Sequence, residues 1–365
     1  MIEMSIPICK PMVSDEEINS VKEVLESGML AQGKKVEEFE KNFSKYTGTK
    51  YGIATSNGTT SLHTALLAAG IKKGDEVITT PFSFIASSNS ILYCGGKPIF
   101  SDIDNKTFNL DPQKLKKKIT DKTKAILLVH LYGQPCGMDE LIEISDENNL
   151  ILIEDACQAH GAEYKGKKCG SFGKVSCFSF YATKNMTTGE GGMILTNSEE
   201  ISEKCKLLRD HGQTSRYYHD VLGYNFRMTD FQAAIGIEQL KKLDNWNKIR
   251  IENAKFLTEN LENLNEIKTP YVSPKVKHVF HQYTIRTEKI SNKNFSDELT
   301  KKGIGNKIYY PVPIHKQNLY LNLGYKENLP EAELASKQVL SLPVHPLVSK
   351  DDLNLIVNSI KEVIE

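Results

Sequence analysis

An acid and a lysine are the residues of this chain whose chemistry is easiest to interpret. Asp155 closes the segment Ile153–Asp155, and Lys184 stands in the polar segment Ser179–Asn185. A lysine amine can hold an aldehyde as a Schiff base, and a carboxylate can keep a pyridine nitrogen protonated so that the ring accepts electrons. Each residue alone is equally well explained as a turn cap or a surface lysine, but together they predict a pyridoxal phosphate site with Asp155 and Lys184 as its catalytic residues.

The residues around Asp155 indicate where that site should lie. Leu150–Ile153 is a continuous apolar run, typical of a strand covered on both faces. Open α/β sheets bind ligands at the carboxyl ends of their strands, so Asp155 is expected there. Gln158 could donate a hydrogen bond to the phenolic oxygen of the cofactor. We expect His160 to support the Asp155 carboxylate, although a buried histidine with no role in the site fits nearly as well.

Two further segments could hold other parts of the cofactor. Ser56–Thr60 links a predicted strand to a helix start, where free amides attract an anion such as phosphate. The same residues are also a plain turn and helix cap. Phe84 follows the next predicted strand and could cover one face of a planar ring, unless it only packs in the core.

The elements that position these residues follow from the apolar pattern. Seven short strands alternate with amphipathic segments, which predicts a mostly parallel sheet covered by helices. We place the strands at Tyr51–Thr55, Val77–Thr80, Pro98–Asp102, Ala125–His130, Leu150–Glu154, Val175–Phe180 and Gly192–Thr196. A helix begins at Asn57 and ends near Gly70, and a long helix over Asp230–Leu261 has an apolar face before charged residues take over.

The rest of the chain predicts a second domain. A chain of 365 residues exceeds one ordinary core, so we expect a large domain over residues 1–240 and a smaller α+β domain over residues 241–365. In the second domain we expect a strand at Gln282–Thr287 and helices at Ser296–Lys302 and Asp351–Ile364.

Composition excludes several classes of protein. Lys plus Arg and Asp plus Glu are equal at 46 each, without a basic stripe, so we expect neither a nucleic-acid nor a membrane partner. No apolar run approaches the roughly 20 residues that span a bilayer. The seven cysteines are scattered without a CxxC pair, and Met1–Ser5 lacks the features of a signal peptide. We therefore expect a cytoplasmic protein with no metal site.

Five ordered motifs carry a resemblance to a known family. They are SNGTTSLHTAL, EDACQAHGA, GSFGKVSCFSFYATKN, TTGEGGMILT and GYNFRMTDFQAAIG. The chain resembles the DegT/DnrJ/EryC1/StrS family of sugar-nucleotide aminotransferases, which depend on pyridoxal phosphate, from about Pro7 to its C-terminus. The resemblance implies a type I aminotransferase fold, α/β with a large mostly parallel seven-stranded sheet, working as a homodimer with shared active sites.

The resemblance also assigns roles to single residues. It implies Lys184 for the Schiff base, Asp155 for the pyridine nitrogen, Gln158 for the phenolate and Phe84 for stacking. Phosphate contacts fall on Gly58, Thr59 and Ser179, and on Asn225 of the neighbouring subunit. Tyr310 and His315 lie in the segment Tyr309–His315, which resembles one that reaches the active site; they are candidate substrate contacts or only stiffen a proline-rich loop.

The resemblance leads to a specific activity. It implies transfer of an amino group, from L-glutamate as amino-acid donor, to C4 of a nucleotide-linked 4-keto-6-deoxyhexose, as in the perosamine-synthase-like members. C3 transfer to a 3-keto sugar remains an alternative. Sugar dehydratases of the family carry histidine at the Schiff-base position, so Lys184 disfavours that reaction. No GxGxxG follows the first strand, which disfavours a nucleotide-dependent oxidoreductase, and little chain precedes the motifs to form a DNA-binding domain of a regulator.

Overall fold

The computed structural model describes residues 6–364; Met1–Ser5, on which the signal-peptide argument rests, and Glu365 lie outside the described part. The helices are α1 (Asp15–Ser27), α2 (Lys34–Thr47), α3 (Gly58–Ala68), α4 (Ala86–Tyr93), α5 (Pro112–Lys116), α6 (Met138–Glu147), α7 (Glu199–Arg209), α8 (Asp230–Leu261), α9 (Asn292–Lys301), α10 (Asn318–Asn322), α11 (Pro330–Gln338) and α12 (Lys350–Ile364). The strands are β1 (Tyr51–Thr55), β2 (Glu76–Thr79), β3 (Lys97–Phe100), β4 (Thr123–Val129), β5 (Ile151–Asp155), β6 (Glu163–Tyr164), β7 (Lys167–Lys168), β8 (Val175–Ser179), β9 (Gly192–Thr196), β10 (Gln213–Ser215), β11 (Tyr218–His219), β12 (Ile267–Lys268), β13 (Val276–Lys277), β14 (Tyr283–Thr287) and β15 (Val339–Leu342).

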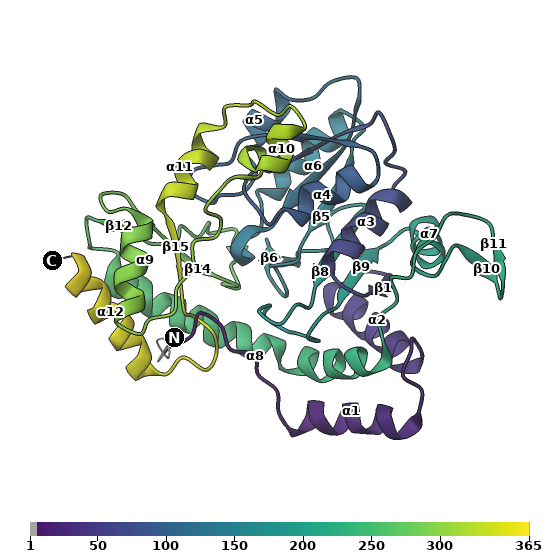
Figure 1. Ribbon diagram of the computed structural model, residues 1–365, viewed down its shortest axis with the longest axis horizontal. Coiled ribbons are helices and arrows are strands. Elements are labelled where there is room, and N and C mark those ends of the chain that lie inside the picture. Colours follow the sequence, from purple (N-terminus) through teal and green to yellow (C-terminus); the bar gives the residue numbers. More distant parts are fainter. Residues whose placement is uncertain (1–5, 365) are drawn as a thin grey trace.

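A seven-stranded sheet forms the centre of the larger part of the molecule. Its order is β1-β9-β8-β5-β4-β2-β3, and β9 is antiparallel to both of its neighbours while the other pairs are parallel. Helices cover the sheet (Figure 1). The prediction of a mostly parallel seven-stranded α/β sheet is confirmed, and each strand begins and ends within two residues of its predicted bounds.

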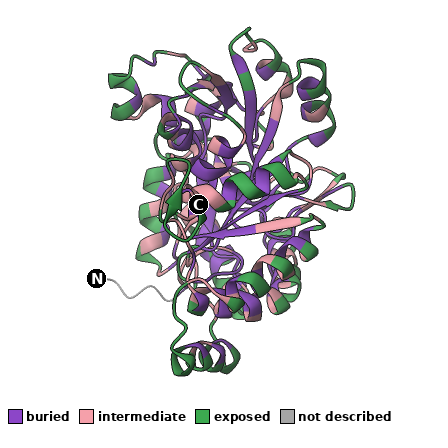
Figure 2. Cartoon of the chain, turned by 90° about the vertical axis from the view of Figure 1, so that its right-hand side faces the viewer, coloured by how far each residue is buried: buried purple, intermediate pink, exposed green. Residues whose placement is uncertain are grey.

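The strands of this sheet are buried because both faces are covered. Figure 2 shows buried residues along the strands and exposed residues on the outer helices. Ile153 at the middle of β5 and Ile194 in β9 are fully buried in one apolar cluster with Leu62 of α3. A parallel sheet with continuous apolar strands needs this double cover. The carboxyl ends of the parallel strands therefore meet at one edge, where functional side chains can gather.

The long helix α8 connects the two parts of the chain. Figure 1 shows it running beneath the central sheet and on to the smaller part, which holds the sheet β12-β14-β15 and the helices α9 and α12. A second apolar core forms there, with Leu257 of α8, Phe295 of α9 and Ile356 of α12 fully buried. Because α8 is unbroken across residues 240 and 241, the predicted domain boundary falls inside a helix, and we retain it only as a prediction.

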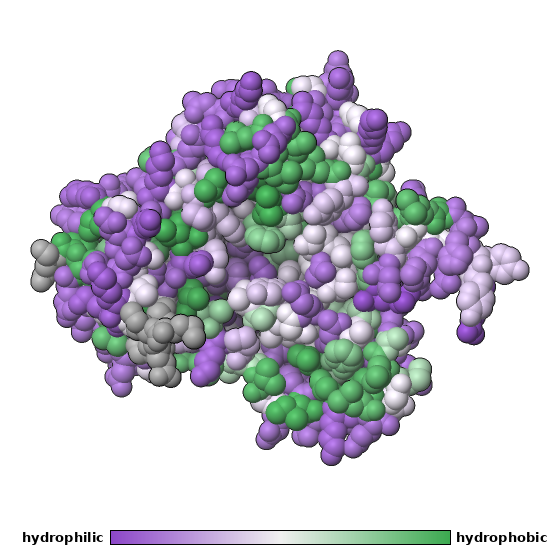
Figure 3. Space-filling view, viewed as in Figure 1, coloured by the Kyte–Doolittle hydropathy of each residue, from purple (hydrophilic) through white to green (hydrophobic). Residues whose placement is uncertain are grey.

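Two elements stand apart from these cores. The β10–β11 hairpin projects from the large part (Figure 1), and the exposed fractions of Tyr217 and Leu222 are 75% and 83%. Apolar side chains also gather over α1 (Figure 3), where Ile18 and Leu25 are exposed. No helix in residues 6–364 is long and apolar enough to cross a membrane.

Candidate active site

A cavity of about 750 Å³ lies at the carboxyl ends of the central strands. Its lining includes eight of the residues that the sequence singled out: Gly58, Thr59, Phe84, Asp155, Gln158, Ser179, Lys184 and Tyr310. They come from segments more than 250 residues apart in the chain. The parallel arrangement explains this convergence, because β5, β8 and the loop after β2 all end at the same edge of the sheet.

The Asp155 carboxylate is held by two donors of its own chain. The Ser87 hydroxyl at the start of α4 donates to Oδ2 at 2.7 Å, and the backbone N–H of Cys157 donates to Oδ1 at 3.2 Å. Our expectation that His160 supports this carboxylate is wrong. The His160 ring lies instead among aromatic side chains, 5.3 Å from the centre of Phe178, and burial lowers its pKa to about 3. An acceptor with fixed position and free lone pairs remains at Asp155.

The neighbouring residue Glu154 fixes the strand from the other side. Successive side chains of a strand point to opposite faces, so Glu154 points away from the cavity. It accepts hydrogen bonds from His130 Nε2 at 3.0 Å and from the N–H of Gly170 at 2.7 Å. The N–H of Cys136 donates to His130 Nδ1, which assigns the proton to Nε2. These contacts anchor the end of β5 and with it Asp155.

The side chain of Gln158 has a defined orientation. Its Oε1 accepts the backbone N–H of Tyr132 at 2.8 Å, so its Nε2 is the end that donates, with the hydroxyl of Tyr310 at 3.2 Å. Nε2 carries two protons, and the second is available in the cavity. Gln158 therefore offers a donor, as a phenolate oxygen requires.

Lys184 lies in the loop after β8 and lines the cavity. Burial lowers the pKa of its amine below the ordinary value, and the nearby groups of Cys157 and Asp155 oppose that shift only in part. In the described part of the chain, no ion pair holds its Nζ. A lysine of this kind is a better nucleophile and base at neutral pH than a solvated one, because more of it is unprotonated.

The N-terminus of α3 points its backbone amides into the same cavity. Asn57 caps the helix by accepting the N–H of Thr60 at 2.9 Å, which leaves the amides of Gly58 and Thr59 without an acceptor in the described part of the chain. A Cβ at Gly58 would stand 2.7 Å from the Cβ of Ser179, so only glycine lets this helix end approach β8. Two free amides beside a serine hydroxyl form a cradle for an anion.

The structure leaves Asn225 and His315 outside the cavity. Asn225 is exposed at the base of the β10–β11 hairpin, and it does not line the site of its own chain. His315 is buried, with Nε2 3.1 Å from Glu333, and its ring packs on Phe100. His315 therefore does not line the cavity, whereas Tyr310 from the same segment does.

Sequence reasoning did not assign a role to several residues of the cavity. Ser87, Tyr132, His281 and Tyr309 all line it. Ser87 stands at the start of α4, directly after the loop that contains Phe84. Its place near the cavity could therefore have been inferred from the sequence. His281 and Tyr309 come from the C-terminal part, whose folding back onto the sheet no local pattern reveals.

The cavity fits pyridoxal phosphate in each of its parts. The space beside Gly58 that a Cβ would fill could receive the phosphate, the Gln158 amide would offer a donor to a phenolate, and Asp155 would provide a buried acceptor for a protonated ring nitrogen. The exposed ring of Phe84 at the same cavity can cover a planar group. The chemistry of these donors and acceptors matches the cofactor that the sequence predicts.

Comparison with known proteins decides the family. Residues 11–361 match the model of the DegT/DnrJ/EryC1/StrS aminotransferase family. The chain belongs to this family. It is 39% identical to GDP-perosamine synthase of Caulobacter vibrioides over 98% of both chains. It is 36% identical to dTDP-3-amino-3,4,6-trideoxy-alpha-D-glucose transaminase of Streptomyces venezuelae, over 94% of this chain and 90% of that one.

A solved structure supports the same assignment. The PLP form of the sugar aminotransferase Spr1654 from Streptococcus pneumoniae superposes with a TM-score of 0.94 at 29% identity, covering 98% of each chain. The predicted type I aminotransferase fold and the predicted family are therefore confirmed. The comparison leaves the roles of single residues as predictions that rest on the geometry described above.

Proposed function

We propose that this aminotransferase moves an amino group from L-glutamate to C4 of a nucleotide-linked 4-keto-6-deoxyhexose. Its cofactor is pyridoxal phosphate, in agreement with the family and with the PLP form of its structural relative. Amino transfer to nucleotide-linked sugars is the activity that the names of both curated relatives indicate. The observation that carries the proposal is a lysine with a lowered pKa in one cavity with a fixed carboxylate and an anion cradle.

Each residue then has a task set by its surroundings. When bound, pyridoxal phosphate supplies a ring that accepts electrons from the reacting carbon. Asp155 keeps the proton on the ring nitrogen by its charge, and Gln158 donates to the phenolic oxygen. Lys184 removes a proton from the donor carbon and returns one to the sugar carbon, because its amine is neutral more often than an ordinary lysine.

Different residues of the cavity would hold the phosphate and the ring. The amides of Gly58 and Thr59 and the Ser179 hydroxyl bind the phosphate at the N-terminus of α3. Phe84 stacks on the ring, and Tyr310 contacts the sugar from the C-terminal segment. Lys184 in the Schiff-base position disfavours the dehydratase alternative, since a dehydratase of this family would carry histidine there.

We also propose a cytoplasmic homodimer with shared active sites. Asn225 is exposed and outside the cavity of its own chain, so its proposed contact with phosphate has to be made in a partner. The exposed hairpin residues Tyr217, Tyr218 and Leu222 give an apolar surface that a partner would cover. The exposed ring of Phe84 at the cavity mouth fits the same arrangement.

The choice between C4 and C3 can be tested directly. Purified protein is incubated with L-glutamate and a panel of nucleotide-linked 4-keto-6-deoxyhexoses and 3-keto-6-deoxyhexoses, and NMR locates the new amine. We expect turnover of the 4-keto compounds with the amine at C4. Turnover of the 3-keto compounds alone would overturn the C4 assignment, and no turnover with any member would count against the proposed substrate class.

A further inference from the structure

A second cavity, of about 20 Å³, adjoins the main one, because Thr183 and Lys184 line both. The segment Cys9–Met12, the loop after β8 and the middle of α8 surround it. Its charged lining residues are Lys10, Lys184 and Arg250, all of them basic. Of these, Lys10 is exposed and the pKa of Lys184 is lowered by burial, whereas Arg250 is buried and has no carboxylate in the lining, so an anion beside it would be favourable.

Arg250 is the most unusual of these cations. It is 6% exposed, yet no carboxylate within residues 6–364 forms an ion pair with it. Its Nη1 donates to the carbonyl of Phe280 at 3.3 Å, and its Nε has no hydrogen-bond partner. Arg209 is buried to the same degree but pairs with Glu40, as buried charges usually do. Burial lowers the pKa of Arg250 to about 10, so it remains a cation at neutral pH.

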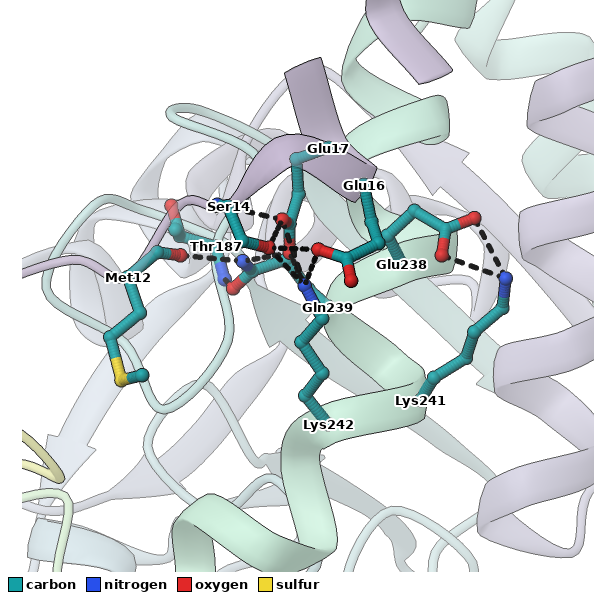
Figure 4. A network of polar contacts seen from close by, with 9 residues as sticks. All are labelled: Met12, Ser14, Glu16, Glu17, Thr187, Glu238, Gln239, Lys241 and Lys242. Carbon is teal, nitrogen blue, oxygen red and sulfur yellow. Dashed lines mark hydrogen bonds and ion pairs between the residues drawn. The ribbon is translucent and has the colours of Figure 1, made fainter. Parts of the chain in front are cut away.

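The cover of this small cavity is fixed in place. Figure 4 shows that Gln239 of α8 donates to the carbonyl of Met12, at 2.7 Å, and accepts the N–H of Thr187, at 3.3 Å. The carboxylate of Glu17 nearby is already satisfied by Lys242, 2.9 Å away, and is not part of the lining. The N-terminal segment therefore closes the space above Arg250 without bringing an acid to it.

Arg250 and Lys184 also act on the same neighbours. Burial, and in addition the charges of Lys184 and Arg250, lower the pKa of His281, which lines the main cavity, and that of His160. Because Lys184 lines both cavities and Arg250 lines the smaller one, a small ligand whose amine reacts where Lys184 stands can extend toward the guanidinium of Arg250. The limited space admits a group of a few atoms, such as a carboxylate, and excludes a nucleotide or a sugar ring.

We propose that Arg250 binds a carboxylate of the amino donor and so sets the specificity for an amino acid in the first half of the reaction. The proposal rests on the proposed aminotransferase function and adds the residue that recognises the donor. Arg250 lines the small cavity, and its planar guanidinium can match a carboxylate with two parallel hydrogen bonds. The nucleotide sugar binds in the larger cavity and does not need this contact.

The chain contains a built-in probe for this site. Trp246 is its single tryptophan, lies one helical turn before Arg250 and lines the same small cavity. Titration of the purified full-length protein with glutarate, which has no amine and cannot react, should change the tryptophan fluorescence in a saturable way. Arg250→Gln should lose this response, and Arg250→Lys should keep a weaker one. Arg286→Gln, which removes an arginine bound to Gln338 and Asn105, is the matched control and should respond as the wild type.

Steady-state kinetics give an independent readout. In a two-step reaction with separate substrates, kcat/KM for each substrate reports only its own half. Arg250→Gln should lower kcat/KM for L-glutamate by about 10- to 100-fold, the usual effect of losing a hydrogen bond to a charged group. The value for the nucleotide sugar should stay unchanged, which a general loss of structure would not allow.

Several outcomes would overturn the proposal. It fails if glutarate leaves the wild-type fluorescence unchanged, if Arg250→Gln responds like the wild type, or if Arg250→Gln impairs both substrates equally while keeping the wild-type melting temperature. Arg227, which pairs with Asp210, is a second arginine for comparison. The proposal also fails if Arg227→Gln lowers kcat/KM for L-glutamate while Arg250→Gln and Arg250→Lys do not. If Arg250→Gln does not fold, the glutarate responses of the wild type and Arg250→Lys are compared. A weaker response in Arg250→Lys supports the proposal, and an equal response overturns it. A wild type that transfers no amino group from any donor would refute the proposed function instead, and the fluorescence titration would still decide the anion site.

Discussion

The wall of the main cavity and the β10–β11 hairpin are built in opposite ways. In the wall, the side chains that matter are held by their own chain: Ser87 fixes Asp155, and the backbone of Tyr132 fixes Gln158. In the hairpin region, Tyr217 and Leu222 are exposed, and Asn225 is exposed and does not line the cavity of its own chain. One chain therefore preorganises the chemistry of the wall, whereas the proposed contact of Asn225 with phosphate would require a second copy.

Among substitutions in the cavity wall, we expect Lys184→Ala to have the largest effect on turnover. Loss of the nucleophile and proton carrier should reduce turnover by about 10³-fold or more while leaving the melting temperature close to that of the wild type. Borohydride reduction of the wild-type protein followed by peptide mapping should find the cofactor attached to Lys184. A label on another lysine would show that the assignment is wrong.

Asp155→Asn tests the fixed carboxylate. The amide keeps the shape of the side chain and can still accept from Ser87, but it has no charge to hold a ring proton. A neighbouring charge shifts a pKa by about 1–3 units, so we expect turnover to fall by about 10- to 1000-fold. Cofactor content, measured after release in alkali, should change much less than turnover. A variant with most of the wild-type rate would remove this role from Asp155.

Mixing two inactive variants tests whether Asn225, at the base of the β10–β11 hairpin, serves the site of the partner. Lys184→Ala and Asn225→Ala proteins are combined at a cofactor concentration that saturates the wild type but not Asn225→Ala. If Asn225 serves the partner, each mixed dimer has one intact site, and random exchange restores about a quarter of the wild-type sites. If Asn225 serves its own chain, no site is intact. Native mass spectrometry confirms the exchange, so that absence of recovery counts against a shared site.

The central fold could be predicted because its determinants are local. The apolar run that ends at Asp155 predicts a buried strand, and Asn57 and Gly70 mark the bounds of α3, where Gly70 has a φ of 86°. The types and spacing of Asp155 and Lys184 likewise indicate the cofactor without any tertiary information. These features depend on neighbours in the sequence, so the sequence alone reveals them.

Other features depend on contacts across the chain and could not be predicted. Ser87 and Asp155 form a hydrogen bond although they are 68 residues apart in the chain. The contact between His315 and Glu333 is not indicated by the proline-rich loop around His315. Charged residues take over in the second half of α8, and their pattern does not show that Arg250 is buried there. The helix passes between two cores, so a charged residue on it can face protein on every side.

Among substitutions in the cavity wall, we expect Ser87→Ala to have the smallest effect on turnover. Its hydroxyl donates to Asp155 at 2.7 Å, and a hydrogen bond to a charged group contributes about 1.5–3 kcal/mol. Because the N–H of Cys157 still holds the other oxygen, we expect only about a tenfold loss of turnover. Ser83→Ala is the matched control, since the Ser83 hydroxyl bonds to Ser87 and to the backbone of Phe84 but not to Asp155. Equal kinetic losses in the two variants would mean that the serine pair supports the loop as a whole. A loss confined to Ser87→Ala, with the melting temperature unchanged in both, would show that the orientation of the carboxylate, and not the loop, limits the rate.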